Sequence, residues 1–291
     1  QAYMKYELGI TGQAVSTIVR RFVCIRNFIE LLEQEKILAI HATVAEVKKY
    51  ADGLRERGIQ AKGFNERIFG IGHFYKFMEV KQYITRMPFR IEYYFQQKEI
   101  VVHHDRSVEE TVYMEILKKL YLFPERLRCM FLHLWCLGLR ASEVCTLKGN
   151  AYYQQGEDYW IQVYQVKMKN YKRIPIPQAL YQIMKVYLKK HEIQPEEFIF
   201  KNSRGGACLY NTFRTQMIEA CRENKIANGE YLFQSHDYRH TVATMFYDSH
   251  VSLQSIRDYL GHTYEEMTRQ YIDYMPQRIA KANDEFFEMQ G

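Results

Sequence analysis

Two histidines and an arginine near the end of the chain have a spacing that suits phosphate chemistry. In the stretch SHDYRHT, His236 and Arg239 are three residues apart, so they share one face of a helix that begins at Ser235. A guanidinium beside an imidazole at a helix N-terminus, where backbone N–H groups point outward, is a good receptor for a phosphate group. The structural alternative is an ordinary helix cap with surface charges.

Arg140, in the stretch GLRASE, could supply a second cation to the same phosphate. It follows a long apolar segment that Gly138 can cap, so a rigid support would carry the guanidinium. An ion pair with Glu143, three residues further on, is the structural alternative. Both interpretations hold if the carboxylate orients the arginine.

Side chains that could move protons or attack phosphorus lie in three other places. A basic turn between two predicted strands carries Lys167, Lys169 and Lys172, and a flexible turn allows an ammonium group to reach into a groove. His262 ends the stretch LGH, and Tyr271 follows nine residues later in RQYIDY. Each has a structural alternative, because surface lysines are common, a histidine can cap a helix and a tyrosine can pack in a core.

The elements that must position these residues begin with a helical bundle. Apolar residues keep a helical period over residues 15–32 and again over residues 68–78. Between them, the capping box Thr43-Val-Ala-Glu46 opens another helix. The predicted units are a helical bundle over residues 1–88 and an interdomain linker over residues 89–106.

A second unit follows, in which the pattern changes from helix to strand and back. The segment CMFLHLWCLGL, residues 129–139, is almost all apolar and predicts a helix that is buried on most sides. β-branched and aromatic side chains in residues 158–166 and 173–177 predict a hairpin or small antiparallel sheet. Helices are predicted over residues 209–223, 235–248 and 252–259, and capping boxes at Ser107 and Thr263 open two more. The predicted fold is mainly α with a small antiparallel β-sheet, with a catalytic unit over residues 107–275 and a tail over residues 276–291.

Composition and charge narrow the class of protein. The chain is 47% hydrophobic and has no apolar run of the roughly 18–20 residues that a membrane span needs, so we expect a soluble cytoplasmic protein. Six cysteines form no CxxC pair and lie mostly among apolar residues, which favours buried thiols over a metal site. Residues 1–100 hold 16 Lys and Arg against 11 Asp and Glu, a net charge of +5 that suits DNA, although an ordinary solvated surface has a similar balance.

Taken in order, these motifs resemble the tyrosine recombinase family, which includes the integrases of phages and conjugative transposons and the Xer-type recombinases. That family's catalytic domain carries an arginine in a G-L-R-x-S-E box, a lysine on a β-hairpin, an H-x-x-R box, a histidine in L-G-H and a tyrosine nine residues later. The resemblance covers residues 107–274, and the basic bundle before them resembles the family's SAM-like core-binding domain. The matching catalytic positions are Arg140, Lys169, His236, Arg239, His262 and Tyr271, with Glu143 in support.

The resemblance implies a site-specific DNA recombinase, an integrase or transposase of a mobile element, that uses neither ATP nor a metal or other cofactor. Tyr271 would attack the scissile phosphate to form a 3′-phosphotyrosyl link. Arg140 and Arg239 would clamp the phosphate oxygens, and His262 would hydrogen-bond the same phosphate.

The same resemblance assigns proton transfer to two residues. Lys169 would be the general acid toward the 5′ oxygen, and His236 would assist proton transfer at the tyrosine. Lys167 stays an alternative to Lys169, which is preferred because its eight-residue distance to Pro177 fits the family hairpin.

The implied partners are double-stranded DNA at attachment sites or element ends, further copies of the chain in a DNA-bound homotetramer, and an accessory DNA-bending or directionality factor at the nucleoid. The tail would dock onto a neighbouring protomer. No arm-binding module, which many integrases carry ahead of this region, is recognised in the chain. Rival interpretations are a type IB topoisomerase, a telomere resolvase and a catalytically silent DNA-binding relative, whereas a metal-dependent nuclease would need a carboxylate cluster that the sequence does not offer.

Overall fold

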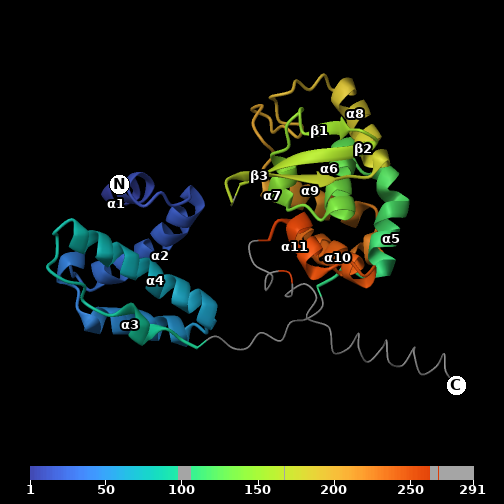
Figure 1. Cartoon of the computed structure of the whole chain (residues 1–291). Coiled ribbons are helices and arrows are strands. Elements are labelled where there is room, and N and C mark those ends of the chain that lie inside the picture. Colours follow the sequence, from blue (N-terminus) through green and yellow to red (C-terminus); the bar gives the residue numbers. More distant parts are fainter. Residues whose placement is uncertain (98–105, 167, 263–267, 269–291) are drawn as a thin grey trace. The chain divides into compact units, whose positions relative to one another are not determined.

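The computed structural model describes residues 1–97, 106–166, 168–262 and 268, and the chain divides into two compact units (Figure 1). The first unit is Gln1–Val102 and the second is His103–Gly291. In the described residues both units are mainly helical, and a three-stranded antiparallel sheet lies in the second, which confirms the predicted fold class. None of the helices in these ranges combines the length and the apolar character needed to cross a membrane.

The first unit is a bundle whose long helices pack through regularly spaced apolar side chains. Ile18, Ile25, Phe28 and Leu32 recur on one face of α2 and are no more than 5% exposed. The capping box that opens α3 is confirmed, because the Thr43 hydroxyl accepts from the backbone N–H of Ala45 and the Glu46 carboxylate accepts from the backbone N–H of Thr43. The helices of this unit are α1 (Ala2–Gly9), α2 (Val15–Gln34), α3 (Val44–Glu56) and α4 (Ala61–Val80).

The segment after α4 differs from the prediction of a linker beginning at residue 89. Phe89 is 6% exposed and packs edge-on against Tyr75, with ring centroids 5.9 Å apart. In the following 3-10 turn, η2 (Ile91–Tyr94), the Ile91 side chain occupies the space in which a Cβ at Gly72 would lie. The sequence did not reveal this packing because an irregular apolar segment has no period to detect.

The second unit is built around α6 (Glu125–Leu137), which packs against α7, α8, α9 and α10 (Figure 1). Met130, Phe131 and Leu134 are fully buried, so the predicted burial of this helix is confirmed. The helices around it are α5 (Glu110–Lys119), α7 (Ala141–Cys145), α8 (Gln178–Lys190), α9 (Tyr210–Glu223), α10 (Ser235–Asp248) and α11 (Leu253–Leu260).

The capping box predicted at Ser107 is wrong. Helix α5 begins at Glu110, and its N-cap residue, Glu109, makes no capping hydrogen bond through its side chain. The backbone N–H of Val108 donates instead to Thr241 Oγ1 on α10 at 2.8 Å, because tertiary contact with α10 replaces the local cap. The helix predicted to open at residue 263 and the tail over residues 276–291 lie outside the described residues.

The sheet has the strand order β1-β2-β3, with β1 (Tyr152–Gln155), β2 (Asp158–Gln165) and β3 (Asn170–Pro175) all antiparallel. The predicted hairpin is therefore confirmed, and β1 adds a strand that the sequence did not indicate. Side chains alternate along β2, so Val163 is buried while Tyr164 is exposed. In the register, Val163 pairs with Lys172 and Ile161 with buried Ile174, so Lys172 shares the inward face of β3.

Candidate active site

Arg140 lies at the junction between α6 and α7. Gly138 ends α6 in the left-handed conformation, with φ of 58°, and a Cβ there would press on Val242 and Leu260 at 3.2 Å. The backbone N–H and Nη1 of Arg140 both donate to the Glu143 carboxylate, each at 2.9 Å. The predicted ion pair is therefore confirmed. Because Glu143 is only 2% exposed, this pair fixes the direction of the Arg140 guanidinium.

Arg239, on the first turns of α10, is fully buried and is the centre of the site. Its Nη1 donates to the Gly138 carbonyl at 2.8 Å, and its Nη2 donates to the Leu260 carbonyl at 2.5 Å. Its Nε donates to His262 Nε2 at 3.3 Å. Burying a charge is costly unless such partners replace water, so the guanidinium fixes the ends of α6 and α11 relative to each other.

His262 follows Gly261, which ends α11 with φ of 70°. The imidazole is 6% exposed, and its Nδ1 lies 2.9 Å from the hydroxyl of fully buried Thr268. Since Nε2 accepts from Arg239, the ring proton is on Nδ1 and points to Thr268. Burial, followed by the charges of Arg239 and Arg140, lowers the pKa of His262 to about 3, so the ring is neutral at pH 7.

His236 and the hairpin lysine lie at the margin of this cluster. His236 is an exposed residue, yet desolvation of its imidazole, followed by the charge of Arg239, lowers the pKa of the ring to about 4. Lys169 is exposed in the β2–β3 turn with φ of 53°, and its ammonium makes no hydrogen bond or ion pair with the other described residues of the site. Lys167 and Tyr271 lie outside the described residues.

Lys172 also belongs to the cluster. The sequence placed it in the basic turn, whereas the structure places it on β3. Its side chain is 8% exposed, and its Nζ lies 3.6 Å from Glu143 Oε2 and 3.3 Å from the Leu260 carbonyl. Burial lowers the pKa of Lys172 to about 8, and the Glu143 carboxylate opposes that shift. The signal available in the sequence was strand parity, because Lys172 precedes buried Ile174 by two residues and therefore points inward.

The charges of the cluster favour an anion. Burial acts to raise the pKa of the Glu143 carboxyl, but the charges of Lys172 and Arg239 outweigh it and hold that pKa below its usual value. With Arg140, the site then combines three cations with one carboxylate and two neutral imidazoles. Such an excess of oriented donors suits a phosphodiester. In the described part of the chain, no group of three or more His, Cys, Asp or Glu side chains could hold a metal ion.

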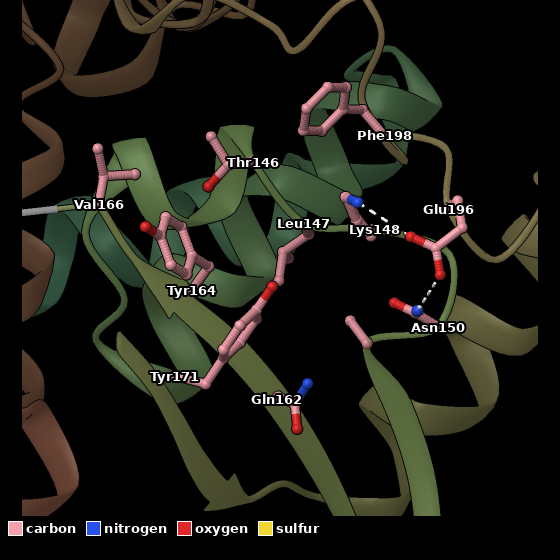
Figure 2. Close-up of a pocket in the computed structure, with 11 residues that line it drawn as sticks. Thr146, Leu147, Lys148, Asn150, Gln162, Tyr164, Val166, Tyr171, Glu196 and Phe198 are labelled. Atoms are coloured by element: carbon pink, nitrogen blue, oxygen red, sulfur yellow. Dashed lines mark hydrogen bonds and ion pairs between the residues drawn. The ribbon is translucent and has the colours of Figure 1, made fainter. Parts of the chain in front are cut away.

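A pocket of about 470 Å³ opens on the other face of the hairpin (Figure 2). It is lined in part by Tyr164 and Tyr171, a cross-strand pair whose ring centroids are 5.0 Å apart. On its far side Lys148 pairs with Glu196 at 3.0 Å, as Figure 2 shows. Because Tyr164 alternates with the inward side chains of β2 and no residue of the charged cluster lines the pocket, the pocket is separate from that cluster.

Comparison with known proteins shows the family to which the chain belongs. The family model described as phage integrase family matches residues 106–278. Transposase B from transposon Tn554 of Staphylococcus aureus is 26% identical over 295 residues, which cover 98% of this chain and 46% of that protein. Tyrosine recombinase XerC of Bacillus licheniformis is 24% identical over 283 residues, which cover 91% of this chain and 88% of that protein. The chain thus spans about half the length of the transposases that it matches.

Solved structures share the fold. XerH site-specific recombinase bound to palindromic difH substrate, in a post-cleavage complex, has a TM-score of 0.69 at 15% identity, covering 97% of this chain and 82% of that one. A lambda integrase tetramer bound to a Holliday junction has a TM-score of 0.67 at 18% identity, covering 92% and 74%. Because the family model covers more than half of the sequence, including both arginine motifs, the chain belongs to the phage integrase family.

Proposed function

We propose that the chain is a site-specific DNA recombinase that breaks and rejoins DNA strands through a covalent link between tyrosine and phosphate. The supporting observation is the convergence of partly exposed Arg140 with the buried side chains of Arg239, Glu143 and His262, which together carry an excess of positive charge. The non-bridging oxygens of a phosphodiester gain charge during transfer, and two guanidinium groups can donate to them in bidentate fashion. Lysines alone would not reproduce that geometry.

Tyr271 is the proposed nucleophile. Its Oη attacks phosphorus, the bond between phosphorus and the 5′ oxygen breaks, and a 3′-phosphotyrosyl link forms. Lys169 gives a proton to the leaving 5′ oxygen, and the tyrosine proton passes toward His236, whose lowered pKa keeps it neutral at pH 7 and able to accept. Attack by the 5′ hydroxyl of a partner strand then reverses these steps, so the bond energy is conserved without ATP, a metal or another cofactor.

His262 needs a change of tautomer to donate to the phosphate. In the described state its Nε2 accepts from Arg239, and its Nδ1 proton points to Thr268. A threonine hydroxyl both donates and accepts, so Thr268 can become the donor to Nδ1 while Nε2 takes the proton. The entering phosphate oxygen would then accept from His262 and from the Nε of Arg239.

The two units have separate proposed roles. The basic bundle over residues 1–88 binds DNA through phosphate contacts, and residues 107–275 carry out the strand transfer. Four copies would assemble on double-stranded DNA at the ends of a mobile element, with the tail over residues 276–291 docked onto a neighbour. Support comes from the transposase relative and from the lambda integrase tetramer on its junction. An accessory DNA-bending factor and action at the nucleoid in the cytoplasm belong to the same proposal.

A covalent capture experiment tests this function and identifies the target sequence at the same time. The whole chain, carrying an affinity tag, is incubated with sheared genomic DNA from the cell that encodes it, quenched with detergent and purified under denaturing conditions. Sequencing of the linked DNA should reveal one enriched site for the wild type and none for Tyr271→Phe. Adducts that persist in Tyr271→Phe and disappear in Tyr274→Phe would contradict the assignment of the nucleophile.

The captured site then separates the rival activities. Joining of strands between two duplexes that carry the site, in the presence of EDTA, supports a recombinase. Supercoil relaxation without exchange of partners would instead indicate a type IB topoisomerase, and loss of cleavage in EDTA would indicate a metal-dependent nuclease. DNA binding without any adduct would indicate a silent relative.

A further inference from the structure

We infer that Lys172 is a positioning residue that joins the two arginines of the phosphate clamp and fixes the β2–β3 hairpin to them. This inference rests on the proposed function, because it assigns a role within the same phosphate site. The family resemblance implies that Lys169, in the hairpin turn, is the general acid. Lys172 instead lies on strand β3, and its side chain faces the interior.

The ammonium of Lys172 stands between the two halves of the clamp. One half is the Glu143 carboxylate, which accepts from the backbone N–H and Nη1 of Arg140 at 2.9 Å and lies 3.6 Å from Lys172 Nζ. The other half is the Leu260 carbonyl, which accepts from Arg239 Nη2 at 2.5 Å and from Lys172 Nζ at 3.3 Å. Each arginine therefore shares an acceptor with the same lysine.

The hairpin has a second contact with the same turn. Gln165, the last residue of β2, is 5% exposed, and its Nε2 donates to the Gly261 carbonyl at 3.4 Å. A Cβ at Gly261 would overlap that amide, so glycine permits the close approach as well as the left-handed turn. Both strands thus contact the turn that presents His262, with Gln165 before and Lys172 after the loop that carries Lys169.

The geometry favours a positioning role over direct proton donation by Lys172. Its ammonium is enclosed and already faces two acceptors, while Lys169 is exposed in the turn and has no ion pair with the described residues. Removing Lys172 leaves Glu143 buried with one cation fewer, and the carboxylate would draw Arg140 away from its productive direction. The hairpin would lose one of its two attachments to the Leu260–Gly261 turn.

A pair of substrates distinguishes positioning from proton donation. Both contain the captured site, one with the ordinary 5′ oxygen and one with sulfur as the bridging atom. A thiolate leaves without a proton, so the sulfur substrate restores cleavage to a protein that lacks only its general acid. Single-turnover cleavage is measured for the wild type, Lys172→Met, Lys172→Arg and Lys169→Met. Affinity for the intact duplex is measured with each change placed in a Tyr271→Phe background.

We expect Lys172→Met to slow cleavage by about 10²-fold, because misplacement of a catalytic group by about 1 Å has that effect. The same loss should appear on the sulfur substrate, with affinity unchanged, and Lys172→Arg should recover most of the rate. Lys169→Met should slow cleavage of the oxygen substrate by about 10²- to 10⁴-fold and recover on sulfur. Recovery of the cleavage rate of Lys172→Met on the sulfur substrate would overturn the inference and make Lys172 the general acid. Cleavage of the oxygen substrate by Lys172→Met at the wild-type rate would also overturn it.

A measurement without DNA keeps this inference separate from the proposed function. If the wild type forms no adduct on either substrate, the proposed recombinase function is wrong. The ion pair is then tested by urea unfolding of the wild type, Lys172→Met, Glu143→Gln and the double variant. We expect the two changes to be coupled, because each leaves the other charge buried without its partner. Additive losses would overturn the inference whatever the activity.

Discussion

Replacing Arg239 by lysine should destabilise the second unit as well as stop catalysis. The three nitrogens of the guanidinium donate to the Gly138 carbonyl, the Leu260 carbonyl and His262 Nε2. Lysine keeps the charge, but its single ammonium cannot reproduce the planar fork that reaches all three acceptors. Arg239→Lys therefore leaves at least one buried acceptor without a donor.

The size of the effect follows from the number of lost contacts. A hydrogen bond from a charged donor contributes about 1.5–3 kcal/mol, and lysine can keep one of the three. The free energy of unfolding should then fall by about 3–6 kcal/mol, which is large against the roughly 5–15 kcal/mol that stabilises an ordinary domain. Because Arg239 is fully buried, water does not reach its acceptors to replace the lost hydrogen bonds.

Urea unfolding followed by tryptophan fluorescence measures this loss directly. The two tryptophans of the chain, Trp135 and Trp160, lie in the second unit, so the signal reports the unit that contains the site. Arg222→Lys, an exposed position at the end of α9, is the matched control and should change stability little. If the unfolding free energy of Arg239→Lys lies within about 1 kcal/mol of the wild-type value, with an unchanged urea dependence, the three hydrogen bonds do not stabilise the unit as expected.

Three further changes test other parts of the site. Gly261→Ala should be more destabilising than Gly205→Ala in the same urea assay. Both glycines have a positive φ, 70° and 78°, but only Gly261 has a neighbouring amide in the path of the new Cβ. Equal losses of stability would exclude that overlap. The pKa of Lys172 is lowered from 10.5 to about 8, so between those values the unfolded chain binds a proton that the folded chain lacks. Lys172 should therefore make the free energy of unfolding rise with pH across that window by up to about 3 kcal/mol. Unfolding measured below and above pH 8 should show this rise in the wild type and not in Lys172→Met. Thr268→Val should slow cleavage without weakening DNA binding, because valine cannot donate to Nδ1 when His262 changes tautomer; wild-type single-turnover rates would contradict that role.

The features that could be predicted from the sequence are local ones. Gly138 and Gly261 end their helices in the left-handed conformation because a helix C-terminus commonly needs it, and both follow apolar residues at helical spacing. The pair between Arg140 and Glu143 spans three residues of one short helix, so its partners are visible in a single motif. Helix α10 begins at Ser235 and ends at Asp248, as the pattern predicts.

The features that could not be predicted depend on contacts distant in the sequence. Lys172 meets the Leu260 carbonyl across 88 positions, and nothing near either residue indicates the other. Helix α1 lacks a one-sided apolar pattern, so periodicity does not reveal it, although Tyr3 is buried against Phe77. The protonation of His262 likewise depends on Arg239 and burial rather than on its LGH motif.

In the proposed reaction, Tyr271 becomes covalently linked to the 3′ phosphate at the captured site. The adduct made by the wild type is digested with nuclease and trypsin, and the peptide over residues 270–278, which contains both Tyr271 and Tyr274, is sequenced by tandem mass spectrometry. We expect a nucleotide 3′-phosphate on Tyr271. A modified Tyr274, or an unmodified peptide from DNA-linked protein, would contradict it.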